Sequence, residues 1–170
     1  MYIDGCPHNF PELANNVLPA HMAKLREAMQ NPWPTSQFSQ PNIGPAKVAA
    51  SIGRKGDFSG CYTMLDSGKP IYVGISRKVL SRLRQHVTGK THFDASLAYL
   101  IAKKRCRTNG KRSEVMNNPT FRSAFEGAQN HLCQLLVAFV EIENPLELYL
   151  FEPYAAIELG THEWNTFRTH

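Results

Sequence analysis

The spacing of apolar and polar residues changes after residue 57, and the following stretch predicts a β-hairpin. Gly60–Leu65 and Pro70–Gly74 are two short runs that favour strands, and Asp66–Lys69 supplies turn residues between them. A glycine in so short a connection permits the positive φ that a tight turn requires. We therefore expect two antiparallel strands joined at this turn.

Helical spacing follows the hairpin. Ser76 is a suitable N-cap for a helix that carries Val79, Leu80, Leu83 and Val87 on one side. A second helix is expected over about residues 94–104, with Leu97, Leu100 and Ile101 stacked on one face. A third is expected from Pro119 to about residue 132. The polar segment 105–118 between these two helices is expected to be a loop.

Residues 135–142 (LLVAFVEI) form the strongest strand pattern, apolar almost throughout, as in a central strand covered on both faces. Asn144 and Pro145 then provide an N-cap and a first-turn proline for a last helix that reaches about residue 159. The predicted order is β-β-α-α-α-β-α. It indicates an α/β (α+β) domain over residues 58–170, with a small, mainly antiparallel three-stranded sheet flanked by helices.

Residues 1–57 differ from the rest because they contain seven of the eleven prolines. The prolines leave room for one clear helix, around residues 21–29, which Asn31-Pro32 would end. We interpret this region as an extension that wraps on the core or is partly flexible, and not as a second domain.

Composition narrows the class of protein without fixing its function. The 170 residues are 42% hydrophobic, and no run of 18 apolar residues is long enough to span a membrane. The first residues lack the features of a secretory signal, and the four cysteines form no C-x-x-C pair, which favours reduced thiols in the cytoplasm. Cys6 and His8 flank a proline, but no second half of a zinc site follows nearby. The net charge of +5 is compatible with an anionic partner.

Two tripeptides on the predicted hairpin carry the most specific signal. Gly60-Cys61-Tyr62 lies on the first strand and Tyr72-Val73-Gly74 on the second, with nine residues between them. Arg82 follows ten residues after Tyr72, and His86 lies four residues further, on the same helix face. The arrangement resembles the GIY-YIG nuclease superfamily, which includes phage homing endonucleases, some restriction enzymes and the incision subunit of nucleotide-excision repair.

The remaining signature of that family is a glutamate on a late helix, followed by an asparagine. Glu152 and, thirteen residues later, Asn165 match this spacing better than Glu147 does. Two departures accompany the match. Cys61 replaces the usual isoleucine, and Pro153 directly follows the proposed metal ligand, so the helix should kink there or begin anew.

The resemblance implies a metal-dependent DNA endonuclease that leaves 5′-phosphate and 3′-hydroxyl ends. Branched or damaged DNA is a candidate substrate. Glu152 would bind Mg²⁺ or Mn²⁺, which prefer carboxylate and water ligands. Arg82 offers a planar fork that matches phosphate oxygens. Tyr62 is the implied general base, with Tyr72 and His86 orienting water or carrying protons. His86 is the alternative base, because a free phenol has a pKa of about 10 whereas imidazole titrates near neutrality.

Supporting roles follow from the same resemblance. Gly60 and Gly74 would shape the site, and Asn165 would tie the C-terminal segment to it.

Positive charge is concentrated beside these motifs. Residues 77–112 contain eleven lysines and arginines and one acid, which gives this stretch +10 while the rest of the chain carries −5. We expect it to follow the phosphate backbone of DNA. The predicted DNA-binding residues are Arg77, Lys78, Arg84, Lys103, Lys104, Arg105, Arg107, Lys111 and Arg112.

Other functions stay open from the sequence. The first alternative is a catalytically weak or inactive nucleic-acid-binding module that assists DNA repair, and a third candidate is a nuclease directed at RNA. A cytoplasmic protein is expected, associated with the nucleoid if the source is bacterial. The sequence gives no signal for the oligomeric state.

Overall fold

The computed structural model describes residues 3–167, which form two compact units. The first unit comprises Asp57–Val79 together with the described residues up to Trp33 and from Leu136 onward. The second comprises Pro34–Gly56 and Leu80–Leu135. Residues before position 57 therefore contribute to both units.

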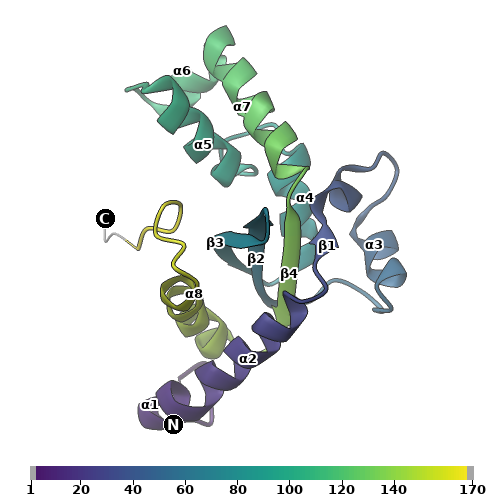
Figure 1. Ribbon diagram of the computed structural model, residues 1–170, viewed down its shortest axis with the longest axis vertical. Coiled ribbons are helices and arrows are strands. Elements are labelled where there is room, and N and C mark those ends of the chain that lie inside the picture. Colours follow the sequence, from purple (N-terminus) through teal and green to yellow (C-terminus); the bar gives the residue numbers. More distant parts are fainter. Residues whose placement is uncertain (1–2, 168–170) are drawn as a thin grey trace. The chain divides into compact units, whose positions relative to one another are not determined.

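The sheet has four strands in the order β1-β4-β2-β3 (Figure 1). They are β1 (Trp33–Pro34), β2 (Gly60–Asp66), β3 (Lys69–Ser76) and β4 (Leu136–Glu141). β2 pairs antiparallel with both β3 and β4. The mixed α and β character is confirmed, but the sheet has four strands and not three. The extra strand contains two residues, too few to show an alternating pattern in the sequence.

The connection between β2 and β3 is a two-residue turn. Ser67 has φ of 50° and Gly68 has φ of 80°, so both central residues adopt positive φ. This conformation follows the twist of paired strands and suits glycine in particular. The predicted hairpin is therefore confirmed, and its register places Tyr62 opposite Gly74 and Met64 opposite Tyr72.

The two faces of the hairpin carry different residues, because successive side chains of a strand point to opposite sides. On one face, Cys61, Leu65 and Val73 pack in a core with helices α2 (Leu18–Ala28) and α8 (Pro145–Leu159). Tyr62 and Tyr72 belong to the other face. This division decides on which side of the sheet each candidate residue lies.

The N-terminal helical region is longer than the sequence predicted. A short helix α1 (Phe10–Glu12) and a π-helical turn (Leu13–Val17) lead directly into α2. Pro11 occupies a first-turn position of α1, where no intrahelical N–H bond is lost. Pro19 lies inside the continuous helical run, just after the π-helical turn. Treating these prolines as helix breakers was therefore wrong.

Helix α8 matches its prediction closely. Asn144 accepts hydrogen bonds from the backbone N–H groups of Leu146 and Glu147, and Gly160 ends the helix with a φ of 67°. The helix passes through Pro153 as one segment, so the expected new start at this residue does not occur. Proline removes the hydrogen bond to the carbonyl of Tyr149, a residue that is 69% exposed.

The second unit is largely helical. Its helices are α3 (Pro45–Ser51), most of α4 (Val79–Thr88), α5 (Ser96–Cys106), α6 (Arg112–Asn117) and α7 (Pro119–Leu132). α5 and α6 both pack against α7 (Figure 1). Two helices, α3 and α6, were not predicted. Pro45 begins α3, and the otherwise polar α6 is anchored by two buried residues, Val115 and Met116.

One predicted core residue of α5 lies elsewhere. Leu97 and Ile101 are buried as expected, but Leu100 is 39% exposed.

Among residues 3–167, no helix is both long and apolar enough to cross a membrane.

Candidate functional site

The two tyrosines of the tripeptides lie side by side on the hairpin. Their ring centroids are 6.3 Å apart and the rings are inclined by 51°. A Cβ atom on Gly74 would lie 2.5 Å from Cζ of Tyr62 and closer still to its hydroxyl. A side chain larger than hydrogen at position 74 would have to displace the buried ring of Tyr62, so the glycine of the second tripeptide makes room for the tyrosine of the first.

Gly60 meets a different neighbour. Its Cβ would overlap the carbonyl oxygen of Val140 in β4 and lie 3.1 Å from the carbonyl carbon. Both glycines are thus required by close approach and not by backbone conformation. Tyr62 is almost fully buried at 1% exposure, whereas Tyr72 is half-buried.

Asn165 binds the edge strand of the sheet. Its Oδ1 accepts a hydrogen bond from the backbone N–H of Val73 at 2.9 Å, and its Nδ2 donates to the carbonyl of the same residue at 2.8 Å. One side chain therefore pairs with both polar groups of Val73, as a neighbouring strand would. This fixes the segment after α8 to the strand that carries Tyr72.

Glu152 lies on the face of α8 between the buried residues Leu148 and Ala156. Its side chain is half-buried, and burial raises the pKa of the carboxyl above its ordinary value. Burial also raises the pKa of the Cys61 thiol, and the nearby charge of Glu152 raises it further. Cys61 and α8 belong to the face opposite the tyrosine rings. The first unit therefore brings Tyr62 and Tyr72 together but presents Glu152 from the other side of the sheet.

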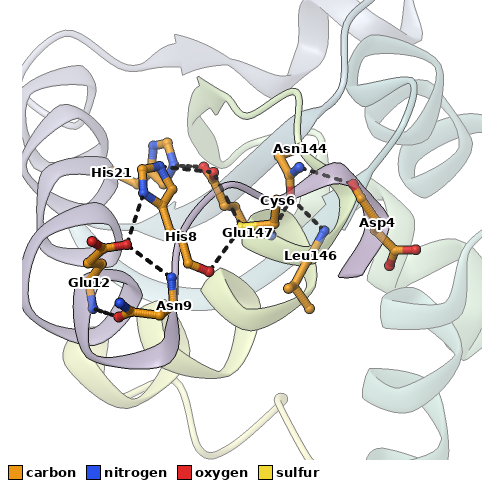
Figure 2. Close-up of polar contacts among 9 residues, drawn as sticks. All are labelled: Asp4, Cys6, His8, Asn9, Glu12, His21, Asn144, Leu146 and Glu147. Carbon is orange, nitrogen blue, oxygen red and sulfur yellow. Dashed lines mark hydrogen bonds and ion pairs between the residues drawn. The ribbon is translucent and has the colours of Figure 1, made fainter. Parts of the chain in front are cut away.

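Glu147, the alternative glutamate, belongs to a separate polar cluster (Figure 2). Its Oε2 lies 2.9 Å from Nε2 of His21, and its Oε1 lies 3.9 Å from Nε2 of His8 and 4.0 Å from Sγ of Cys6. His8 also faces Glu12 at 3.7 Å. The carboxylate thus joins the N-terminal segment and α2 to the first turn of α8. Sequence reasoning missed this cluster because its members lie up to 141 residues apart.

Arg82 is engaged within its own unit. Nη1 donates to the carbonyl of Asp94 at 2.8 Å and Nη2 donates to the hydroxyl of Ser96 at 2.8 Å. A longer bond reaches Gln85. The guanidinium thereby joins α4 to the segment that leads into α5. Its acceptors here are neutral, so the positive charge is not cancelled by a carboxylate in these contacts.

His86 follows one turn after Arg82 on α4 and is completely buried. Burial, and secondarily the charge of Arg82, lowers the pKa of His86 to about 3. The imidazole is therefore neutral near pH 7 and a weak proton acceptor. The advantage expected for His86 as a base from its ordinary pKa is removed by its surroundings.

The predicted DNA-binding residues differ in their contacts. Nη1 of Arg84 donates to the carbonyls of Phe38 at 3.1 Å, Gln40 at 3.4 Å and Ile43 at 2.6 Å, so this guanidinium holds a loop of its own unit. We remove Arg84 from the proposed nucleic-acid surface. The others have exposed side chains: Arg77, Lys78, Lys103, Lys104, Arg105, Arg107, Lys111 and Arg112.

A metal ligand set made wholly of protein groups is absent from the described residues, since no three or more His, Cys, Asp or Glu side chains there are arranged to hold a metal ion. Mg²⁺ does not require such a set, because it keeps several waters and takes one or two carboxylates plus substrate phosphates. Glu152 is the candidate for that single-carboxylate role, but burial disfavours its ionised form, so a bound cation would have to offset that cost.

Comparison of the chain with protein-family models, with curated proteins and with solved structures gives no match. The resemblance to GIY-YIG nucleases therefore stays an expectation from the sequence elements alone.

Proposed function

We propose that this protein is a divalent-metal-dependent endonuclease that hydrolyses phosphodiester bonds of DNA with a GIY-YIG active site. The observation that carries the proposal is the fit of Tyr62 over Gly74, beside Tyr72. It gives a structural reason for both tripeptides at once, because the glycine of one strand makes room for the tyrosine of the other.

In this proposal, Tyr62 accepts the proton of the attacking water and Tyr72 orients that water. Because Tyr62 is 1% exposed, the water must reach its phenol from the side of the half-buried Tyr72. Phenols are weak bases near neutrality, so Tyr62 must act beside positive charge. His86 is a positioning group and not the base, since its pKa of about 3 makes it too weak an acceptor. Arg82 contributes a permanent charge for the phosphate oxygens.

Glu152 would hold Mg²⁺ or Mn²⁺, and the bound cation would polarise the phosphate and assist the departing 3′ oxygen. The edge of β3 is the region we favour for this chemistry. Asn165 binds there at Val73, whose side chain packs in the core with α8 while the flanking residues Tyr72 and Gly74 belong to the opposite face.

A nucleic-acid-binding or repair-accessory module without strong cleavage is the second candidate. Three observations favour it: Arg82 is engaged by Asp94 and Ser96, His86 is a weak base, and Glu152 belongs to a helix on the face opposite the tyrosines. An RNA-directed nuclease remains a third candidate, supported only by the same positive charge.

Incubation of the purified protein with supercoiled plasmid and with branched DNA, in Mg²⁺ or Mn²⁺, separates the first two candidates. The endonuclease converts supercoiled plasmid to the nicked form or cuts the branched substrate. DNA binding with no cleavage of any substrate supports the accessory module instead. A parallel incubation with an RNA of matched sequence tests the third candidate.

A further inference from the structure

The solvent-facing side of α5 carries a stripe of side chains that ends in a pocket. Leu100, Lys103, Lys104 and Arg107 recur at the i, i+3, i+4, i+7 spacing that places residues on one helix face. With Thr108 and Asn109 they line an open pocket of about 430 Å³. The opposite side of the helix is buried and packs against α7.

The charge of this pocket is strongly positive. Lys103 and Arg107 are exposed and form no ion pair with a carboxylate in the described part of the chain. The C-terminal end of a helix carries about half an elementary negative charge. Lys103 and Arg107 together outweigh it, so an anion is attracted to the end of α5.

Two features point to a ligand larger than a simple anion. Leu100, expected in the core, is instead 39% exposed and provides an apolar surface in the pocket lining. The volume lies within the range of about 300–1,000 Å³ that holds small organic ligands. A phosphate with its attached sugar uses both the cations and the apolar surface.

Thr108 adds a hydrogen-bonding group at the same place. Its Oγ1 is buried and has no hydrogen-bond partner within the described protein. A buried polar atom without a partner is uncommon in native proteins and calls for an explanation such as a bound ligand or water. A phosphate oxygen would accept the bond that this hydroxyl can donate.

We propose that this pocket binds one nucleotide unit of a DNA strand, with the phosphate held by Lys103, Arg107 and Thr108 and the sugar against Leu100. The inference rests on the proposed function for the choice of DNA as the ligand. It deepens that function by assigning a defined phosphate position to what the sequence showed only as a charged segment.

The test measures the affinity of a fluorescein-labelled DNA oligonucleotide in EDTA, so that no cleavage occurs. Lys103→Gln and Thr108→Val should each weaken binding about tenfold at low salt. Lys24→Gln removes one exposed cation from α2 as a charge-matched control and should change affinity less than twofold. The thermal midpoint of Thr108→Val should not fall below that of the wild type, because the buried hydroxyl has no protein partner to lose.

Competition identifies the source of the phosphate. Thymidine monophosphate should displace the oligonucleotide at lower concentration than inorganic phosphate, and thymidine without phosphate should not displace it. Equal effects of Lys103→Gln and Lys24→Gln, or unchanged affinity of Thr108→Val, overturn the proposal. Plasmid cleavage by the wild type is scored separately. If the wild type cleaves plasmid but the pocket variants bind DNA normally, only this inference is wrong. If the pocket binds DNA but no cleavage occurs, only the proposed nuclease activity is wrong.

Discussion

The phenol of Tyr62 lies over Gly74, on the neighbouring strand, so closely that a methyl group at position 74 would have to displace it. The pair stands directly opposite in the register of β2 and β3. Each tripeptide therefore constrains the other, and the pattern of glycine and tyrosine is a packing relationship as well as a sequence signature.

Replacement of Gly74 by alanine should destabilise the protein by about 1–3 kcal/mol, the usual cost of overpacking a filled site. Denaturant unfolding measures the free energy. Tyr62→Ala should reduce this cost in a double-mutant cycle, with a coupling of at least about 0.5 kcal/mol. Gly127→Ala is the matched control, because a Cβ there meets nothing within 4 Å, and it should stabilise α7 by about 0.5–1 kcal/mol. Equal losses for the two alanine variants would refute the packing argument.

Asn165 should be replaceable only by a residue that both donates and accepts. Asn165→Asp keeps an acceptor for the Val73 N–H but loses the donor to its carbonyl, and Asn165→Leu loses both bonds. Each lost bond should cost about 1 kcal/mol. Hydrogen exchange at the Val73 amide should be accelerated strongly by leucine and weakly by aspartate. Similar protection in all three proteins would contradict the assigned contact.

His86 should make the protein less stable in mild acid. In the unfolded chain histidine binds a proton below about pH 6.5, whereas in the folded protein its pKa is lowered to about 3. Between these values the unfolded state binds more protons, so stability is lost as the pH falls, by at most about 1.4 kcal/mol per pH unit.

Comparison of the free energy of unfolding from pH 7.5 to pH 5 in the wild type and in His86→Gln isolates this contribution. The variant should show the shallower dependence on pH. Parallel curves for the two proteins would mean that His86 titrates in the folded state much as it does in the unfolded chain.

Arg84 should matter for stability and not for DNA affinity. Arg84→Lys keeps the charge but cannot reproduce the contacts with three carbonyls, so we expect a loss of about 1–3 kcal/mol and faster proteolysis near residues 38–43. The salt dependence of DNA binding should not change. For Lys103→Gln, in contrast, the slope of log K against log salt should fall by about 0.9. A reduced salt dependence of DNA binding in Arg84→Gln would mean that Arg84 does contact DNA.

The local elements were largely readable from the sequence because their signals are local. The hairpin turn, the Asn144 cap and the helix from Pro119 to Leu132 each follow from a few adjacent residues. The two-residue strand β1 could not be predicted, because it depends on pairing within the sheet. Helix α6 could not be predicted either, because it depends on two buried side chains in an otherwise polar segment.

The candidate site was readable only in part, for a related reason. Spacing predicted the hairpin that carries both tripeptides, but not its register, which places Tyr62 opposite Gly74. It also could not show that Arg84 donates to neighbouring carbonyls or that burial would weaken His86 as a base. The His21–Glu147 contact joins residues 126 positions apart, so no local sequence pattern predicts it. Hydrogen-bond partners and pKa shifts depend on the surroundings of a side chain, so they can be predicted only once the fold is known.

The most direct test of the nuclease is the rate of nicking of supercoiled plasmid in Mg²⁺ by the wild type, Glu152→Gln and Glu143→Gln. Glu143 is an exposed glutamate that precedes α8 and serves as the matched control. Metal-dependent nicking should be retained in Glu143→Gln and fall at least about 100-fold in Glu152→Gln, with ligatable 5′-phosphate and 3′-hydroxyl ends in the products. Equal rates for all three proteins, or no nicking by the wild type on any DNA substrate, would contradict the account.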